Sequence, residues 1–357
     1  MQQQKRVLFT VLDWGLGHAT RSIPVIETLL NRGFDVQLAG EGNSLLLLKN
    51  HFPNLCTHNL YGIQVSFSNS SFGIIMMIPQ LLNSIKREHQ QFLTLCNELK
   101  PDLIISDNRY GAWHPTIQSI FIGHQLYLQA PNRFTKWIEP LLFHFHSKFL
   151  KRFSKVWIPD TVGENNLSGI LAHHPSINQH LHCEFIGPLS RFSSSDNHPT
   201  ENIYEVVVLI SGPEPQRSIF QEACVKEAAR IDKKTLILLG QPHKNEKIIR
   251  GNITLVSHLV DEDLLPILQQ ASFVVCRSGY STLMDLAKLN KTALCIPTPG
   301  QTEQLYLAKH LSEQHKIIYQ EQHKMNWEKG FQDLSRVKQL SFSADGLLNQ
   351  VIEKLLL

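Results

Sequence analysis

Short apolar runs alternate along the chain with longer segments of helical periodicity. One run extends from Val7 to Leu12, the segment from His18 to Asn31 carries apolar residues three and four positions apart, and a second run follows from Phe34 to Ala39. Short apolar runs indicate buried strands, and the 3.6-residue period indicates helices between them. This alternation predicts parallel sheets covered by helices, the doubly wound α/β class.

The same alternation continues toward the C-terminus. Further strands are predicted at residues 103–106, 119–122, 156–158, 206–210, 235–239, 253–256, 273–276 and 292–296. Helices are predicted over residues 75–99, 137–153 and 347–357, and others are predicted to begin at Gln216, at Asp263 and at Ser281 or Thr282. The pattern thus contains enough strands for two sheets.

A polar stretch divides the pattern into two halves. Residues 190–203 are rich in Ser, Asn and Pro, which is typical of a linker. We therefore predict an N-terminal domain over residues 1–189, a linker over 190–203 and a C-terminal domain over 204–342, followed by a last helical segment over 343–357.

Composition limits the class of protein. The chain has 357 residues, of which 42% are hydrophobic and 18% charged, so it can form two globular domains with their own cores. A formal net charge of +3 does not indicate a nucleic-acid partner. The six cysteines form no CxxC pair, and we find neither a secretory leader nor an apolar run of the roughly 20 residues that span a membrane, so we expect a cytoplasmic protein with reduced thiols.

The most informative chemistry follows the strand predicted from Phe273 to Cys276. A small-residue turn, Ser278-Gly279, comes next, and a helical pattern begins after it. This order directs free backbone N–H groups and the positive end of the helix toward a ligand above the sheet edge, most often a phosphate. Asp285 lies one turn into the helix, where its carboxylate can accept hydrogen bonds from sugar hydroxyls. The segment therefore predicts a nucleotide-sugar pocket.

This turn and helix resemble a motif of glycosyltransferase family 28, the family of the UDP-N-acetylglucosamine transferase of peptidoglycan precursor synthesis. The family pattern is Arg-Ser-Gly-x-x-Thr-x-x-Glu, and the chain reads Arg277-Ser278-Gly279-Tyr280-Ser281-Thr282-Leu283-Met284-Asp285. The resemblance implies the GT-B fold, two Rossmann-like doubly wound domains with a cleft between them and a C-terminal helix that packs back on the first domain. It also implies transfer of a hexose or N-acetylhexosamine from a UDP-sugar, with inversion at the anomeric carbon.

Other segments are similar to parts of the family's donor site. Arg191 follows a Gly-Pro turn as does the family's diphosphate-binding Arg, Ser211-Gly212 retain part of a phosphate turn, and Val260 stands where relatives hold uracil. Asp in place of Glu at position 285 and Leu305 in place of a second Gln leave the identity of the donor sugar open. The donor-binding residues that the resemblance implies are Arg191, Ser211, Gly212, Val260, Arg277, Ser278, Gly279, Ser281, Thr282, Asp285 and, in the loop after the last predicted strand, Gln301, Glu303 and Gln304.

The loop after the first strand carries a candidate base. Gly15 and Gly17 allow close backbone approach, and His18 begins the predicted helix. The loop resembles the Gly-x-Gly-His loop of the same family. An imidazole with a pKa near 6.5 can remove a proton from an acceptor hydroxyl, so we predict His18, or a nearby carboxylate such as Asp13, as the general base. The alternatives are that His18 only positions the acceptor, or only contacts the backbone at the start of the helix.

The acceptor side is predicted from strand ends. Asp107, Asn108 and Arg109 follow one predicted strand and His124 follows the next, at the edge where ligands of α/β sheets collect. Together with Gly15 and Gly17, these four are the candidate acceptor-side residues. The acceptor itself is left open between a glycan, a lipid-linked molecule and a small molecule.

Three other functions compete with glycosyl transfer. Gly15-x-Gly17-x-x-Thr20, with Glu41 after the second strand, partly matches a dinucleotide-binding fingerprint but lacks its third glycine. A UDP-sugar 2-epimerase of the same fold needs an additional acid–base pair, and none is identified in the sequence. A non-catalytic nucleotide-sugar-binding protein needs Asp285 and Gln304 but not His18.

No cofactor and no metal are expected, and the UDP-sugar is a co-substrate. Asp261-Glu262-Asp263 has the Asp-x-Asp form of some metal sites, but it begins a predicted helix, where acidic residues are explained by capping. No HExxH or CxxC motif occurs in the sequence.

Membrane contact at the periphery is a further hypothesis. The segment from Arg133 to Trp157 mixes Lys and Arg with Trp, Leu and Phe, as basic amphipathic helices of membrane surfaces do. The apolar residues from Ile74 to Ile78 are assigned to the same surface. A core-facing helix with a solvated basic side is the alternative.

Overall fold

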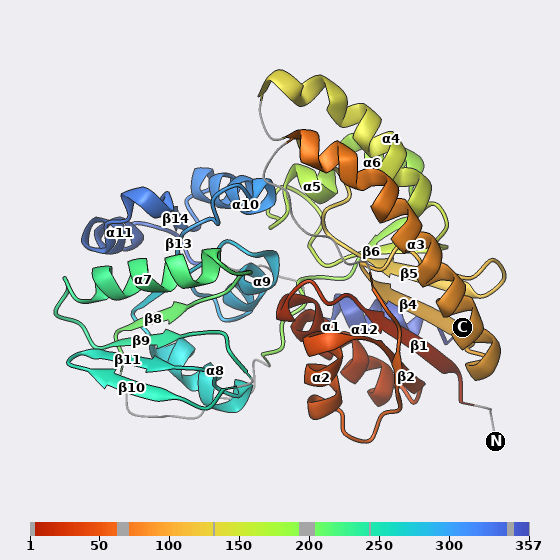
Figure 1. The fold of residues 1–357 in the computed structure, drawn as a ribbon, viewed down its shortest axis with the longest axis horizontal. Coiled ribbons are helices and arrows are strands. Elements are labelled where there is room, and N and C mark those ends of the chain that lie inside the picture. The colour runs from red at the N-terminus through yellow and green to blue at the C-terminus, as the bar shows by residue number, and fades with distance from the viewer. Residues whose placement is uncertain are drawn as a thin grey trace. The chain divides into compact units, whose positions relative to one another are not determined.

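The computed structural model describes residues 4–62, 71–130, 133–192, 204–242, 244–340 and 346–356, without the side chains of residues 71–78 and 133–134. The chain forms two compact units. The first comprises Met1–Leu189 and Ala344–Leu357, and the second comprises Ser190–Ser343. Each unit is built on a seven-stranded sheet with helices packed against it (Figure 1).

The sheet of the first unit is entirely parallel. Its strand order is β3-β2-β1-β4-β5-β6-β7. The strands are β1 (Arg6–Val11), β2 (Asp35–Gly40), β3 (Thr57–Asn59), β4 (Leu103–Asp107), β5 (Gln118–Ile122), β6 (Lys155–Ile158) and β7 (Cys183–Phe185). The helices of this unit are α1 (Leu16–Asn31), α2 (Gly42–His51), α3 (Ser71–Leu99), the 3-10 helix η1 (Arg133–Ile138), α4 (Glu139–Leu150), α5 (Ile170–His173), α6 (Pro175–His180) and α12 (Leu347–Glu353).

Burial explains why the central strands are read so clearly in the sequence. Every residue of β4 is buried, and in β1 only Arg6 is not. Because helices cover both faces of a parallel sheet, its central strands need apolar residues at successive positions rather than at alternate ones. Val11 at the end of β1 is paired in register with Asp107 at the end of β4, so the two strands finish at the same edge.

The second unit repeats the design with one antiparallel edge strand. Its order is β10-β11-β9-β8-β12-β13-β14, and β10 is antiparallel to β11. The strands are β8 (Val206–Leu209), β9 (Thr235–Leu238), β10 (Lys247–Arg250), β11 (Ile253–Val256), β12 (Phe273–Cys276), β13 (Leu294–Cys295) and β14 (Ile318–Tyr319). The helices are α7 (Gln216–Ala228), α8 (Asp261–Gln270), α9 (Tyr280–Lys288), α10 (Thr302–Glu313), the 3-10 helix η2 (Gln322–Lys324) and α11 (Trp327–Leu334).

The last helix of the described chain belongs to the first unit. Val351 and Ile352 of α12 are buried, and α12 packs against α1. Lys5 donates a 2.9 Å hydrogen bond from Nζ to the carbonyl of Leu355, and Arg32 pairs with Glu353 at 3.1 Å. The first unit therefore consists of two stretches of the chain, one that precedes the second unit in the sequence and one that follows it.

The two doubly wound α/β domains expected from the sequence are confirmed; the differences are short elements that were not predicted, such as β3, β10 and β14, and the bounds of others. α1 begins at Leu16 rather than His18, the helix predicted over 137–153 is divided into η1 and α4, and the strand predicted over 292–296 is reduced to β13. Of the predicted linker, Ser190 to Phe192 lie in the second unit, and residues 193–203 are outside the described part of the chain.

Candidate active site

Two elements of the first unit bring His18 and Asp107 to the same sheet edge. A short loop leads from β1 into α1 and places His18 in the first turn of that helix, while Asp107 is the last residue of β4. From β1 and β4 the strand order runs in opposite directions, toward β3 on one side and β7 on the other. Ligands of doubly wound sheets bind at such a switch point.

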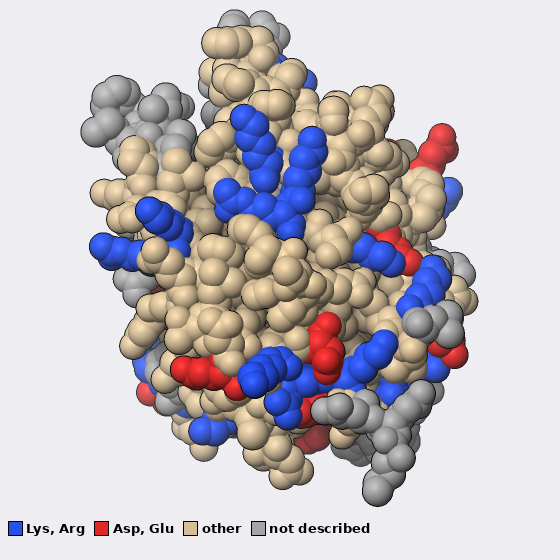
Figure 2. Space-filling model, turned by 90° about the vertical axis from the view of Figure 1, so that its right-hand side faces the viewer, with Lys and Arg blue, Asp and Glu red and all other residues tan. Residues whose placement is uncertain are grey.

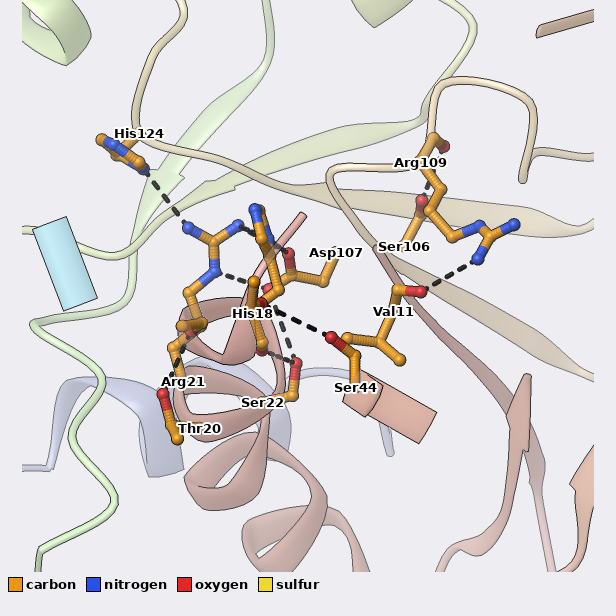
Figure 3. A network of polar contacts seen from close by, with 12 residues as sticks. Val11, His18, Thr20, Arg21, Ser22, Ser44, Ser106, Asp107, Arg109 and His124 are labelled. Atoms are coloured by element: carbon orange, nitrogen blue, oxygen red, sulfur yellow. Dashed lines mark hydrogen bonds and ion pairs between the residues drawn. The ribbon is translucent and has the colours of Figure 1, made fainter. Parts of the chain in front are cut away.

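The His18 ring and the Asp107 carboxylate form a short hydrogen bond. Nδ1 of His18 lies 2.6 Å from Oδ1 of Asp107 (Figure 3). The Asp107 side chain is 0% exposed and that of His18 is 16% exposed. An ionised carboxylate only accepts hydrogen bonds, so in this pair the ring donates its Nδ1 proton. A neutral ring of this tautomer carries its lone pair on Nε2, which is then the nitrogen that can accept a proton.

Arg21 holds the same carboxylate with two hydrogen bonds. Its Nε donates to Oδ2 of Asp107 at 2.6 Å, and one terminal nitrogen donates to Oδ1 at 2.5 Å (Figure 3). That terminal nitrogen is also 2.9 Å from Nδ1 of His18, and the other is 3.3 Å from Nδ1 of His124. Ser22 completes the cluster, since its hydroxyl donates to the carbonyl of His18 at 2.7 Å and lies 3.5 Å from Oδ2 of Asp107.

The charges of this cluster set its protonation states. Burial disfavours the Asp107 carboxylate, but Arg21 and His18 outweigh burial, and the pKa of Asp107 falls to about 2. Burial and the adjacent Arg21 guanidinium lower the pKa of His18 from its ordinary 6.5, against the opposing effect of Asp107. At neutral pH the pair is therefore a carboxylate and a neutral imidazole, the state that a general base requires.

Asp13 serves α2 rather than this cluster. Its Oδ1 accepts a hydrogen bond from the backbone N–H of Ser44 in the first turn of α2, at 2.9 Å. A Cβ at Gly42 would lie 1.9 Å from Oδ2 of Asp13, so the carboxylate is held close against the start of that helix. In this structure Asp13 caps α2, and its assignment as an alternative base stays a prediction. Gly15 is the N-cap of α1, and Gly17 lies within the helix.

Of the remaining acceptor-side candidates, Arg109 is removed from solvent. Its Nε pairs with Oε1 of Glu88 at 2.7 Å, and its two terminal nitrogens donate to the carbonyls of Val11 and Leu60 at 2.9 and 2.8 Å. The side chain is fully buried, so Arg109 binds strand ends together and does not face a ligand. Asn108 occupies the left-handed region at φ 55°, and its N–H donates to the carbonyl of Ile122.

In the second unit, the predicted phosphate-binding turn lies at the corresponding sheet edge. Gly279 is the N-cap of α9, with open space where a Cβ would stand, and the half-buried Ser281 and Thr282 form the first turn of the helix. Ser278 is itself buried, and its hydroxyl donates to the carbonyl of Gln304 at 2.7 Å. The first turn of α9 therefore presents backbone N–H groups at this edge, while the Ser278 hydroxyl stabilises the loop beneath it.

Arg191 is bound by two carboxylates of the second unit. One terminal nitrogen lies 2.9 Å from Oδ1 of Asp261, and Nε lies 3.4 Å from Oδ2 of Asp285. Asp285 also accepts a 2.8 Å hydrogen bond from the hydroxyl of Ser190. Burial raises the pKa of Asp285 against the opposing effect of Arg191. Arg191, predicted to bind the diphosphate, and Asp285, predicted to bind the ribose, thus lie side by side, and in this structure they form an ion pair with each other.

Arg277 is buried in the loops rather than directed to a ligand. It donates to the carbonyls of Ile296, Pro297 and Gln216 at 3.0, 3.2 and 3.1 Å, and its guanidinium stacks on the ring of Phe220 at 3.8 Å. Burial lowers its pKa to about 10. Its hydrogen bonds join the loop after β13 to the first residue of α7, which is a structural role; its assignment as a donor-binding residue stays a prediction.

Glu214 occupies the start of α7, where a phosphate turn was only weakly indicated. Its carboxylate accepts from the backbone N–H of Ser218 at 3.2 Å and pairs with Arg217 at 2.5 Å. The start of this helix is therefore already capped by an acidic side chain. Ser211 and Gly212, which follow β8 after the buried Ile210, are exposed.

The predicted sugar loop is in fact largely helical. Gln301 is the N-cap of α10, and Glu303 and Gln304 lie in its first turn. Oε1 of Gln304 accepts from the backbone N–H of Thr298 at 2.8 Å, which ties the helix to the loop after β13. Val260 is the N-cap of α8 and is 53% exposed, so it stays available at the same edge of the sheet.

The sequence prediction missed Arg21. It lies three residues after His18 on α1, and residues three apart on a helix share a face, so the spacing gave a signal. The partner of Arg21, Asp107, is 86 residues further along the chain. Their contact could be found only once the fold was known. Within the described residues, no group of three or more His, Cys, Asp or Glu side chains is arranged to hold a metal ion.

Two domain models match the chain. The glycosyltransferase family 28 C-terminal domain matches residues 214–340, and the glycosyl transferase family 1 domain matches residues 5–117. A protein of Methanosarcina acetivorans described as an uncharacterized glycosyltransferase is 25% identical over 331 residues, which cover 84% of this chain and 81% of the relative.

Solved structures with the same fold share little sequence with this chain. The glycotransferase of kitacinnamycin is 14% identical with a TM-score of 0.65, covering 99% of this chain and 94% of that one. Arabidopsis thaliana UGT89C1 complexed with UDP-L-rhamnose is 14% identical with a TM-score of 0.60, covering 99% and 93%. MurG of Acinetobacter baumannii is 12% identical with a TM-score of 0.56, covering 98% and 99%.

The fold is that of the GT-B glycosyltransferases. Both matched domains are glycosyltransferase domains: the second unit matches the family 28 C-terminal domain, as the motif at residues 277–285 indicated, and the first unit matches the family 1 domain.

Proposed function

We propose that the protein transfers a hexose or N-acetylhexosamine from a UDP-sugar to a hydroxyl acceptor, with inversion and without a metal ion. The observation that carries this proposal is the 2.6 Å hydrogen bond between Nδ1 of His18 and Oδ1 of Asp107 at the switch point of the first sheet. It supports a neutral imidazole whose Nε2 accepts a proton.

In the proposed reaction, Nε2 of His18 takes the proton of the acceptor hydroxyl. The acceptor oxygen forms a bond to the anomeric carbon as the bond from that carbon to the diphosphate oxygen breaks, and the electron pair leaves with UDP. The Asp107 carboxylate stabilises the imidazolium that results, since it holds Nδ1 at 2.6 Å. A single displacement of this kind inverts the anomeric centre.

The donor is assigned to the second unit. Backbone N–H groups at the start of α9 favour the diphosphate, and the Asp285 carboxylate suits the ribose hydroxyls. Arg191 would exchange its contact with Asp261 for a diphosphate oxygen, a forked interaction that guanidinium groups favour. The UDP-L-rhamnose complex of UGT89C1 supports UDP as the nucleotide by analogy of fold.

The donor assignment is tested by thermal stabilisation with UDP, GDP, ADP, NAD and several UDP-sugars in the presence of EDTA. A ligand that binds only the folded state raises the melting temperature. We expect an increase with UDP or one UDP-sugar that EDTA does not change. Stabilisation by NAD alone would reject the transferase. The structure does not favour that outcome, because Glu41 of the dinucleotide fingerprint accepts a hydrogen bond from the backbone N–H of Gly62 at 2.6 Å.

Catalysis is tested by His18→Ala with the stabilising UDP-sugar. Turnover should fall by about 10²- to 10⁴-fold while UDP affinity stays within about twofold. His51→Ala removes an exposed histidine of the same unit and should leave both unchanged. A non-catalytic binding protein would bind UDP without turnover in every variant, and a 2-epimerase would convert the UDP-sugar without any acceptor.

We also propose that the acceptor is reached at an anionic membrane surface. Trp137, Leu141 and Phe145 repeat every four residues along η1 and α4 and are 77%, 66% and 41% exposed. Exposed Lys148, Lys151 and Arg152 continue the segment. On the face drawn in Figure 2, Lys and Arg side chains lie among uncharged surface in the upper part of the view, and acidic side chains lie beside basic ones lower down. The side chains of residues 74–78 lie outside the described part of the chain. No helix among the described residues is long and apolar enough to span a bilayer.

Liposome co-sedimentation tests the membrane proposal. The wild-type protein should sediment with vesicles that contain anionic lipid and less with neutral vesicles, because the surface combines apolar and basic side chains. Trp137→Gln with Leu141→Gln should abolish sedimentation, whereas Ile249→Gln, at an equally exposed apolar residue of β10, should not. If the wild-type protein sediments with neither kind of vesicle, the proposal is rejected.

A further inference from the structure

We propose that Arg21 is a positioning residue for His18: its guanidinium fixes the Asp107 carboxylate in the orientation that receives the Nδ1 proton, and so makes Nε2 the reacting nitrogen. The inference rests on the proposed function for its consequence in catalysis. Its structural content stands on the contacts of three side chains.

The first observation is the geometry of the clamp. Nε of Arg21 donates to Oδ2 of Asp107 and a terminal nitrogen donates to Oδ1, at 2.6 and 2.5 Å, so both carboxylate oxygens are held by one planar group. Only Arg offers two parallel donors in this spacing. Because the carboxylate cannot rotate, Oδ1 stays 2.6 Å from Nδ1 of His18.

The second observation is that Arg21 is buried and that its guanidinium nitrogens lie close to Asp107, His18 and His124. It is 3% exposed, and the terminal nitrogen that does not contact Asp107 lies 3.3 Å from Nδ1 of His124 (Figure 3). A buried guanidinium without a carboxylate partner is costly, so Arg21 and Asp107 stabilise each other in their charged forms. An ionised Asp107 cannot donate a proton, and Nδ1 of His18 must therefore carry one.

The third observation concerns the charge that His18 experiences. Asp107 alone would favour an imidazolium, and a protonated ring cannot act as a base. Arg21 places a cation 2.9 Å from Nδ1 and offsets that attraction. The other titratable groups that face the cluster are His124, after β5, which also disfavours the imidazolium, and Tyr110, whose hydroxyl is buried near Arg21. Arg21 thus lets His18 keep its orienting carboxylate and still be neutral.

NMR of histidine-labelled protein tests the inference without any turnover. In the wild-type protein, the nitrogen shifts of His18 should report a proton on Nδ1 and none on Nε2, and the ring should titrate below its ordinary pKa. In Arg21→Gln the pKa of His18 should rise by about one unit or more, since Asp107 is no longer offset. In Arg21→Lys the charge remains but the fork is lost, so the pKa should stay low while the Nδ1 proton signal broadens.

The pH dependence of kcat/KM supplies the second measurement. Its acid limb, which reports deprotonation of the base, should move to higher pH in Arg21→Gln and stay in place in Arg21→Lys. Arg32→Gln, which removes a cation at the other end of α1, is the matched control and should move neither the limb nor the His18 titration.

Two results would overturn the inference: a wild-type His18 ring protonated on Nε2, or a His18 pKa in Arg21→Gln equal to that of the wild type. Should Arg21→Gln fail to fold, the wild-type tautomer and the Nδ1 proton signal of Arg21→Lys decide the question, and an Nδ1 signal as sharp as that of the wild type would reject the inference. Normal NMR results in a protein that transfers no sugar would reject the proposed function and leave the role of Arg21 toward His18 intact.

Discussion

Arg109 and Glu88 form an ion pair that solvent does not reach: Nε lies 2.7 Å from Oε1, and both side chains are 0% exposed. The second carboxylate oxygen of Glu88 accepts from the backbone N–H of Gly111 at 2.8 Å, and the remaining nitrogens of Arg109 donate to the carbonyls of Val11 and Leu60. One pair therefore joins α3 to the ends of β1 and β3 and to the turn after β4.

Arg109→Met should destabilise the first unit strongly. It leaves the Glu88 carboxylate buried without a cation and two carbonyls without donors, and removal of one partner of a buried pair costs about 3–5 kcal/mol. Urea unfolding measures the loss. Arg32→Met breaks an exposed pair and should cost less than about 1 kcal/mol. Equal losses in the two variants would contradict the role assigned to Arg109.

Asp107→Asn should impair both chemistry and stability. An amide cannot hold the Nδ1 proton of His18 as a carboxylate does, so kcat/KM should fall at least about 100-fold. Arg21 would also lose its only carboxylate contact in the cluster, which should lower the melting temperature. Asp102→Asn changes a carboxylate that accepts from the backbone N–H of Arg6 and should leave kcat/KM unchanged. An active Asp107→Asn protein would remove Asp107 from the mechanism.

His146 should make the fold sensitive to mild acid. Its Nδ1 donates to the carbonyl of Leu126 at 3.0 Å, and its Nε2 accepts from the Tyr110 hydroxyl at 2.9 Å. Burial lowers the pKa of His146 to about 4, so below pH 6.5 the unfolded chain binds a proton that the folded chain does not bind until about pH 4. Stability should fall as pH decreases through this window, by about 3 kcal/mol from this residue.

Comparison with His146→Gln isolates this effect. The variant keeps a neutral amide at the same place, so the difference in unfolding free energy between the two proteins should change between pH 6.5 and 4 and be constant above pH 7. A difference that is independent of pH across the whole range would contradict the assignment.

Asp261→Asn should strengthen binding of UDP. In the wild-type protein, the guanidinium of Arg191 forms ion pairs with the carboxylates of both Asp261 and Asp285. Loss of one negative charge frees Arg191 and reduces repulsion of a diphosphate, and about 1 kcal/mol corresponds to a roughly fivefold lower Kd. Calorimetry at low and high salt measures the change. Asp263→Asn, an exposed acid of the same helical turn, should have a smaller effect; weaker UDP binding in Asp261→Asn would place the diphosphate elsewhere.

Gly42→Ala should be more harmful than Gly33→Ala. Both glycines have positive φ, at +59° and +82°, which costs an L-residue about 1–2 kcal/mol. A Cβ at Gly33 would have no atom within 4 Å, whereas a Cβ at Gly42 would lie 1.9 Å from Oδ2 of Asp13. Gly42→Ala must therefore displace the carboxylate that caps α2, and its melting temperature should be clearly the lower of the two. Equal melting temperatures would contradict this role of Asp13.

The fold was predictable because its central strands are buried on both faces. β8 and β12 are apolar throughout, and β1 and β4 each contain a run of three apolar residues, Val7 to Phe9 and Leu103 to Ile105. The short edge strands were not found. β3 has three residues and none is buried, and all four residues of β10 are exposed, so neither leaves an apolar run.

The candidate site was predictable only in part. His18 was identified from its loop and Asp107 from its place after a strand, but their hydrogen bond joins residues 89 positions apart. Arg109 and Arg277 were predicted as ligand-binding residues, and each lies just after the end of a strand, β4 or β12. Their burial results from packing against distant segments, which no local pattern reports.

The origin of α12 in the chain affects how the protein is made. A ribosome completes the seven strands of the first sheet early, but α12 emerges only after the whole second unit, which takes roughly 8–30 s at about 5–20 residues per second. During that interval Arg32 lacks Glu353, and the surface of α1 that α12 later covers stays open to water. The first unit, although its whole sheet is made early, therefore needs the last residues of the chain before that surface of α1 can be buried.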